Sequence, residues 1–173
     1  VNAIRTSHNA CDPQMLDLCD EMGIIVWNEC FDKWTGTAGK LPEQNLEEYV
    51  EKNLLAFVRR DRNHPSVVAW SIGNEIHHKK KDGMTAARFR RFRAAMRTLD
   101  MTRPVGIGCC HSEAVRTGMF RELDLSGWNY KEKYVKVHRK HPDKPVVYTE
   151  SASAVSSYGS YWLPPAGFKT AYN

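Results

Sequence analysis

Short apolar runs alternate with longer amphipathic segments along most of the chain. The clearest run, at residues 67–72, reads VVAWSI and is apolar at nearly every position. Such a run is typical of a strand that is buried on both faces, as in a parallel sheet. Five further strands are predicted at residues 2–7, 24–27, 104–109, 123–128 and 145–149.

Segments with apolar residues at helical spacing separate these strands. Helices are predicted over about residues 13–22, 43–62, 85–99, 112–121 and 131–140. Asp12 and Pro13 form a helix-start pair, because Asp caps a helix and Pro fits its first position. Gly23 is predicted to end the same helix.

The order of elements is strand then helix, five times, followed by a last strand. This order requires parallel strands with right-handed crossovers. Two architectures fit, namely an open doubly wound sheet and part of an eight-stranded barrel. No Gly-rich phosphate loop follows the first strand, which weighs against a nucleotide-binding open sheet. Six strands cannot close an eight-stranded barrel, so a barrel would lack at least two strands.

Composition indicates an ordinary globular domain. A chain of 173 residues is long enough for one domain with a hydrophobic core. Its residues are 42% hydrophobic and 26% charged, which is ordinary for a globular protein. The apolar runs are too short to span a membrane. Five cysteines without a Cys-x-x-Cys spacing predict reduced thiols rather than a disulfide framework. The chain opens directly in a strand-like segment, which predicts a piece of a longer protein.

The net charge of +5 is concentrated in residues 88–97, which contain five arginines. Such a cluster could be a footprint for nucleic acid. However, Phe89, Phe92 and Met96 recur at helical spacing and leave the arginines on the opposite face. We therefore predict a solvated face of an amphipathic helix and no nucleic-acid partner.

Polar residues gather where the predicted strands end. In chain order they are His8, Glu29, Asn74, Glu75, Asn129, Tyr130 and Glu150. Parallel strands bring these ends to one face, where sites of α/β proteins are built. Gly73 is predicted to turn the chain sharply before Asn74. Taken alone, Asn74 and Glu75 fit equally well the cap and first turn of a helix.

Glu75 and Glu150 suggest a paired acid and base. Hydrolysis of a glycosidic bond uses one carboxyl group to protonate the leaving oxygen, while the other attacks the anomeric carbon or activates water. A metal site built from carboxylates and His8, His77 and His78 is the competing use. Adjacent histidines in a Lys-rich loop are poor ligands, and there is no His-Glu-x-x-His motif, so no metal is predicted.

Five segments carry a family resemblance. They are NAIRTSHN at 2–9, CDEMGIIVWNE at 19–29, RDRNHPSVVAWSIGNE at 60–75, LSGWNY at 125–130 and PVVYTES at 145–151. In order and spacing they resemble the catalytic barrel of family 2 glycoside hydrolases, which include β-galactosidases, β-glucuronidases and β-mannosidases. The resemblance implies a TIM (β/α)8 barrel that is incomplete, with strands two to seven present. Residues 1–173 would form a partial catalytic barrel domain, without the remaining strands and the β-sandwich domains of the parent chain.

The resemblance also implies residue roles. Glu75 matches the general acid/base and Glu150 the nucleophile. Arg5 and Tyr130 resemble the residues that hydrogen-bond the nucleophile, and Asn74 resembles the residue that binds the sugar 2-hydroxyl. The other substrate-binding candidates are His8, Glu29 and Asn129, and Trp162 is a candidate stacking wall. Two structural alternatives stay open: Arg5 could pair only with Glu29, and Tyr130 could simply begin the next helix.

The sequence thus predicts a retaining exo-β-glycosidase that needs no cofactor, with β-galactosides as the expected substrates. β-Glucuronidase or β-mannosidase activity is the alternative within the family. A non-catalytic sugar-binding or structural fragment is the alternative of another class, because an incomplete barrel exposes two sheet edges. Asn28 replaces the aspartate that is common in the family, and Ser-Ala-Ser follows Glu150 in place of aromatic-Gly. These departures bear on the substrate more than on the mechanism.

Overall fold

The computed structural model describes residues 1–34, 45–76, 85–116, 118–130 and 134–151. Its strands are β1 (Ala3–Arg5), β2 (Ile25–Glu29), β3 (Val67–Asn74), β4 (Val105–Cys109), β5 (Ser126–Asn129) and β6 (Val146–Glu150). Its helices are α1 (Pro13–Met22), α2 (Leu46–Asp61), α3 (Ala86–Arg97), the 3₁₀ helix η1 (Ser112–Val115), α4 (Met119–Glu122) and α5 (Tyr134–Lys140).

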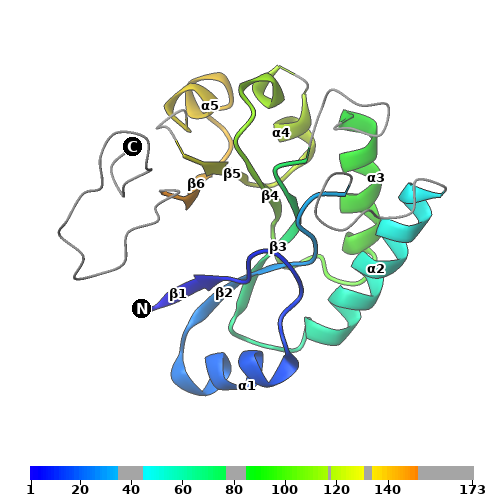
Figure 1. Ribbon diagram of the computed structural model, residues 1–173, viewed down its shortest axis with the longest axis vertical. Coiled ribbons are helices and arrows are strands. Elements are labelled where there is room, and N and C mark those ends of the chain that lie inside the picture. Colours follow the sequence, from blue (N-terminus) through cyan, green and yellow to red (C-terminus); the bar gives the residue numbers. More distant parts are fainter. Residues whose placement is uncertain (35–44, 77–84, 117, 131–133, 152–173) are drawn as a thin grey trace, which may run out of the picture.

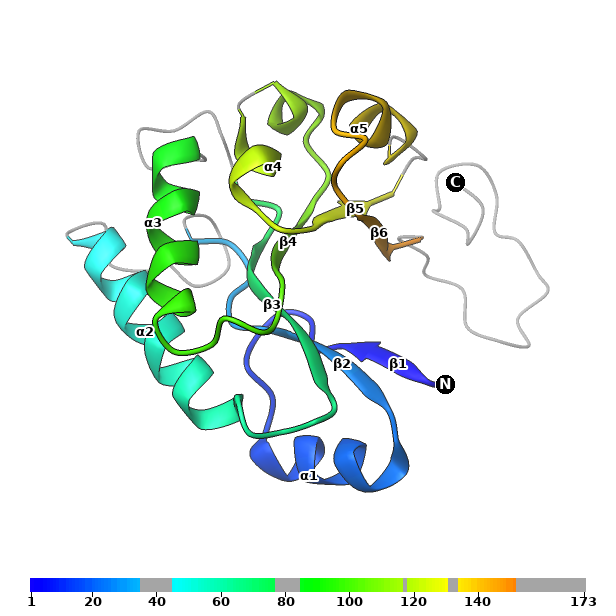
Figure 2. The ribbon, with the colours of Figure 1, turned by 180° about the vertical axis from the view of Figure 1, so that it is seen from behind.

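The six strands form one parallel sheet in the order β1-β2-β3-β4-β5-β6. Each strand is the neighbour of the next strand in the chain, so the order has no switch point of the doubly wound kind. The helices lie in an arc around the outside of the sheet, and the edge strands β1 and β6 lie on the side where this arc is open (Figures 1 and 2). The described residues therefore form a half-barrel, as predicted.

The strand at β3 departs from the prediction at its end. It continues through Gly73 to Asn74 rather than turning at the glycine. A Cβ at Gly73 would lie 2.6 Å from Ile76 Cδ1 and 3.1 Å from Trp34 Nε1. Gly73 is thus needed for close packing rather than for a change of direction. The prediction of a sharp turn there is wrong.

The predicted boundaries agree with the structure for the helix at 13–22 and disagree for the helix at 112–121. The Asp12 side chain accepts a hydrogen bond from Gln14 N at 2.8 Å, and Gly23 follows α1 in the left-handed region at φ 69°, as predicted. The continuous helix expected over 112–121 is wrong. Gly118, at φ 78°, separates η1 from α4 there. The expected starts at 43 and 131 fall outside the described residues.

The core lies between the sheet and the inner faces of the surrounding helices, with many of its largest side chains on α2 and α3. Leu54, Phe89 and Phe92 are fully buried, and Trp34 stacks edge-on against Phe92 with ring centroids 5.0 Å apart. Trp70 on β3 is buried as well, and its indole nitrogen donates to Asp100 at 2.9 Å. These large aromatic side chains fix the helices against β3, whose last residues enter the candidate site.

The arginines of α3 are paired with carboxylates of neighbouring elements. Arg88 and Arg91 contact Glu47 on α2 at 3.0 and 2.8 Å. The remaining partners are Glu51 for Arg91, Glu122 for Arg90, and Asp124 for Arg93 and Arg97. Phosphates would have to compete with these carboxylates for the same cations. The pairing favours the interpretation as an amphipathic helix over a nucleic-acid footprint.

Two composition-based predictions can be compared with the structure. All five cysteines are free thiols, three of them buried, in line with the predicted absence of a disulfide framework. Among the described residues no helix is both long enough and apolar enough to cross a membrane.

Candidate active site

The candidate residues lie at the C-terminal ends of five strands. Arg5, Glu29, Asn74, Asn129 and Glu150 are the last residues of β1, β2, β3, β5 and β6. Glu75 and Tyr130 follow directly, and His8 lies in the turn after β1. The parallel order brings all of them to one end of the half-barrel.

The guanidinium of Arg5 joins three of these strand ends. Its Nε donates to Glu29 Oε2 at 2.9 Å, and its Nη1 donates to Glu150 Oε1 at 2.8 Å. Its Nη2 donates to Asn74 Oδ1 at 2.8 Å. Arg5 therefore pairs with Glu29 and with Glu150 together. The alternative in which it pairs only with Glu29 is wrong.

The carboxylate of Glu150 has two strong donors. Arg5 binds one oxygen, and the Tyr130 hydroxyl donates to the other. Burial by itself would raise the pKa of Glu150, but the hydrogen bonds from Tyr130 and Arg5 outweigh burial and lower that pKa below its ordinary value. The surroundings of Glu150 thus favour an ionised carboxylate, the state that a nucleophile requires.

Glu29 and His8 form the buried side of the same network. The Glu29 side chain has no exposed surface and accepts from Ser71 Oγ at 2.7 Å in addition to Arg5. His8 Nδ1 lies 2.9 Å from Glu29 Oε1. This hydrogen bond raises the pKa of His8 above its ordinary value, against the opposing effect of burial. Of the two residues, His8 is the one with exposed surface, and its Nε2 lies 3.8 Å from Glu150.

Asn129 connects Asn74 to Glu75. Its Nδ2 donates to Asn74 Oδ1 at 2.9 Å and to Glu75 Oε1 at 3.1 Å. Thr149 Oγ1 donates to Asn129 Oδ1 at 2.6 Å, which fixes the orientation of the amide. The chain Glu150–Arg5–Asn74–Asn129–Glu75 is therefore continuous. Both carboxylates belong to one hydrogen-bonded site.

The backbone also shapes this site. Glu75 has φ 47° and Tyr130 has φ 59°, a left-handed conformation that costs energy for residues other than glycine. Asn74 ends a strand, and the next described helix, α3, has Thr85 as its cap. The alternative that Asn74 and Glu75 begin a helix is wrong. Tyr130, which reaches Glu150, has a role besides preceding α5.

A glycine admits Arg5 to the interior. A Cβ at Gly108 would lie 2.6 Å from Arg5 Nη2 and 2.8 Å from Asn74 Oδ1. Any larger residue at position 108 would therefore push apart the guanidinium of Arg5 and the amide of Asn74 that it binds. Trp27, Ala69 and Leu125 pack together as a separate small apolar cluster.

Three residues that the sequence patterns did not single out also contact the site. Asp32 Oδ1 accepts from Asn74 Nδ2 at 3.1 Å and from Lys33 Nζ at 3.0 Å. Lys33 Nζ lies 3.7 Å from Glu75 Oε2. Burial, together with a hydrogen bond to Glu75, raises the pKa of the Cys110 thiol to about 12. Their common signal is position, since each lies shortly after a strand that ends in the site.

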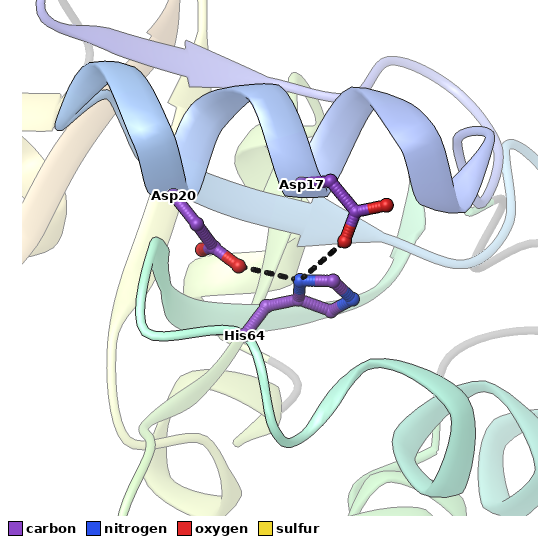
Figure 3. A group of neighbouring side chains, drawn as sticks. All are labelled: Asp17, Asp20 and His64. Carbon is purple, nitrogen blue, oxygen red and sulfur yellow. Dashed lines mark hydrogen bonds and ion pairs between the residues drawn. The ribbon is translucent and has the colours of Figure 1, made fainter.

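The described residues contain one cluster with the composition of a metal site, Asp17, Asp20 and His64 (Figure 3). His64 Nδ1 lies 2.7 Å from Asp20 Oδ2, and Ser66 N donates to Asp20 Oδ1 at 2.8 Å. These bonds hold α1 to the segment that precedes β3, at the end of the strands opposite the candidate site. Of the earlier candidates, His77, His78 and Trp162 lie outside the described residues.

Comparison with known proteins gives the family of the chain. The family model described as glycosyl hydrolases family 2, TIM barrel domain, matches residues 1–172. The chain belongs to glycoside hydrolase family 2. This family 2 chain is 35% identical to a β-galactosidase of Bacteroides ovatus, in an alignment that covers 94% of the present chain. It is 38% identical to the mouse β-glucuronidase over 60% of its length.

Solved structures show the same relationship. A family 2 member from Bacteroides cellulosilyticus is 36% identical, has a TM-score of 0.77 and matches 88% of this family 2 chain. The chain spans 23% of the length of the B. ovatus relative and 20% of the solved B. cellulosilyticus chain.

Proposed function

We propose that residues 1–173 form part of the catalytic barrel domain of a retaining exo-β-glycosidase. In this proposal Glu150 is the nucleophile and Glu75 the general acid/base. The observation that carries the proposal is the continuous hydrogen-bonded chain from Glu150 through Arg5, Asn74 and Asn129 to Glu75. It joins Glu150, whose ionised form is favoured by the hydrogen bonds from Arg5 and Tyr130, to a second carboxyl group, and retaining hydrolysis uses one ionised and one protonated carboxyl group.

The mechanism has two displacements. In the first, Glu150 attacks the anomeric carbon, the glycosidic bond breaks, and the Glu75 carboxyl group gives its proton to the leaving oxygen. In the second, Glu75, now a carboxylate, takes a proton from water as the water displaces Glu150 from the sugar. Asn74 would hydrogen-bond the sugar 2-hydroxyl. His8 and Asn129 complete the proposed substrate-binding residues. Glu29, which the sequence also suggested as a sugar contact, has no exposed side-chain surface, so its proposed role is to orient Arg5 and His8.

We propose terminal β-galactosides as the substrates. The B. ovatus relative that matches 94% of the chain is named a β-galactosidase, which supports this choice. Other relatives are named β-glucuronidases, so β-glucuronides are the second candidate. In the full-length protein, 4-nitrophenyl β-galactoside should be hydrolysed faster than the corresponding glucuronide and mannoside. A preference for either of these would refute the galactoside assignment and leave the mechanism intact.

The rest of the barrel is the expected partner of this chain. An open cavity of about 440 Å³ lies on the concave side of the sheet and is lined by apolar residues that include Ile4, Trp27, Leu125 and Val147. Such a surface is normally covered in a soluble protein. We propose that barrel strands of the parent protein outside these residues cover it and complete the sheet between β1 and β6.

Tyr130→Phe is expected to move the acidic limb of the kcat/KM–pH profile to higher pH. Glu150 must be ionised to attack, and the Tyr130 hydrogen bond helps to keep its pKa low. Without this bond the pKa of Glu150 rises, so protonation abolishes activity at a higher pH than in the wild type. Losing one hydrogen bond to a charged group predicts a shift of about one pH unit.

The matched control is Tyr148→Phe. Tyr148 lies on β6, and its hydroxyl donates to the backbone oxygen of Ser151 at 3.1 Å rather than to Glu75 or Glu150. This variant should keep the wild-type profile. A Tyr130→Phe profile with an unmoved acidic limb would contradict the assignment of Glu150 as the ionised group.

A further inference from the structure

Lys33 and Asp32 form an ion pair beside the proposed acid/base. Lys33 Nζ lies 3.0 Å from Asp32 Oδ1 and 3.7 Å from Glu75 Oε2. Its side chain is 25% exposed, so the ammonium is partly withdrawn from water. A charge in that position interacts more strongly with its neighbours than a fully solvated one does.

The same pair reaches Asn74. Asp32 Oδ1 accepts from Asn74 Nδ2 at 3.1 Å, and the backbone oxygen of Asp32 accepts from Asn74 N at 2.8 Å. Asn74 Oδ1 meanwhile accepts from Arg5 and Asn129. Asp32 therefore fixes which end of the Asn74 amide faces the network, and it holds the backbone that leads into Glu75.

The two charges stabilise each other. Burial lowers the pKa of Lys33, but its bond to Asp32 and the charges of Asp32 and Glu75 outweigh burial and raise that pKa. Burial also acts to raise the pKa of Asp32, and the hydrogen bonds from Lys33 and Asn74 reverse this effect and lower it. Both groups stay ionised over the working range of an enzyme, so Lys33 presents a fixed positive charge to Glu75.

We propose that Lys33, anchored by Asp32, is a positioning residue for the acid/base. This inference rests on the proposed function. The Glu75 carboxyl group lies between two side chains, with Asn129 Nδ2 3.1 Å from its Oε1 and Lys33 Nζ 3.7 Å from its Oε2. Lys33 restricts rotation of the carboxyl group and orients the oxygen that transfers the proton. A residue in this role affects the steps that need proton transfer and spares the steps that do not.

Leaving-group dependence separates this role from a merely structural one. A 2,4-dinitrophenyl glycoside departs without protonation, whereas an alkyl glycoside of the same sugar needs the acid. Lys33→Met in the full-length protein is expected to lower kcat/KM for the alkyl glycoside about tenfold to hundredfold, because a misplaced catalytic group loses rate on that scale. The dinitrophenyl substrate should lose less than about threefold.

Two variants complete the test. Lys33→Arg keeps the charge. It should also lose kcat/KM selectively for the alkyl glycoside, but by a smaller factor than Lys33→Met. Lys144→Met removes a lysine that bonds Leu123 O at 2.9 Å near the start of β6, and it should leave both rates unchanged.

The outcomes are distinguishable. An equal loss on both substrates in Lys33→Arg and Lys33→Met, or no loss on either, would overturn the positioning role while the glycosidase proposal stands. A wild-type protein that hydrolyses neither glycoside would refute the proposed function and this inference with it.

Discussion

Glu150→Gln is expected to reduce kcat/KM by at least about 10⁴-fold on every substrate, including those with good leaving groups, because removal of a nucleophile has effects of this size. The amide has nearly the shape of the carboxylate but cannot form the glycosyl ester. Its NH₂ group would also face Arg5 or Tyr130, both of which donate to Glu150 in the wild type. Steady-state kinetics of the full-length protein with a dinitrophenyl glycoside measures the loss.

The control for this prediction is Glu122→Gln. Glu122 lies on α4 and pairs with Arg90 at 2.7 Å on the outside of the half-barrel. This variant should keep wild-type activity and nearly wild-type thermal stability, since surface pairs contribute little. Glu150→Gln should also stay folded, as judged by circular dichroism. Folded Glu150→Gln with more than about a tenth of wild-type activity is incompatible with a nucleophilic role.

Glu75→Ala is expected to show a loss that depends on the leaving group. For alkyl glycosides the loss should be about 10² to 10⁴-fold, the usual contribution of general acid catalysis. For dinitrophenyl glycosides the first displacement should survive, and the second should become slow because water has lost its base. A burst of dinitrophenol followed by a slow steady state is the expected time course.

Azide provides the decisive addition to this experiment. The small anion fits the space left by the carboxylate and needs no base, so it should accelerate the Glu75→Ala steady state and release a β-glycosyl azide. The same addition should do nothing for Glu150→Gln. If azide does not accelerate Glu75→Ala, and this variant loses equal activity on alkyl and dinitrophenyl glycosides, the assignment of Glu75 as acid/base is contradicted.

The strands could be predicted because their signal is local. Val67–Asn74 is almost continuously apolar, and burial on both faces of a parallel strand leaves that mark in the sequence. The convergence of Glu29, Asn74 and Glu150 also followed from topology, because parallel strands end on one face. Their roles, in contrast, came from the family resemblance rather than from periodicity.

What the sequence did not reveal depends on contacts between distant residues. In the sequence Lys33 looks like any exposed lysine after a strand. In the structure its Nζ lies 3.7 Å from Oε2 of Glu75, which is 42 positions further along the chain. Glycine is a residue typical of turns, but at position 73 its small size is required because Trp34 and Ile76 pack against it. Gly118 broke the expected helix at 112–121 through a positive φ that a hydrophobic pattern does not encode.

In the proposed mechanism a sugar becomes covalently attached to Glu150. A 2-deoxy-2-fluoro galactoside with a dinitrophenyl leaving group tests it directly in the full-length protein, because fluorine at C2 slows the second displacement and lets the ester accumulate. Digestion and mass spectrometry then locate the label. We expect stoichiometric inactivation with the sugar on the peptide that contains PVVYTES, at Glu150. Inactivation with the label on Glu75 or Glu29, or turnover that yields the inverted sugar without a trapped ester, would contradict this mechanism.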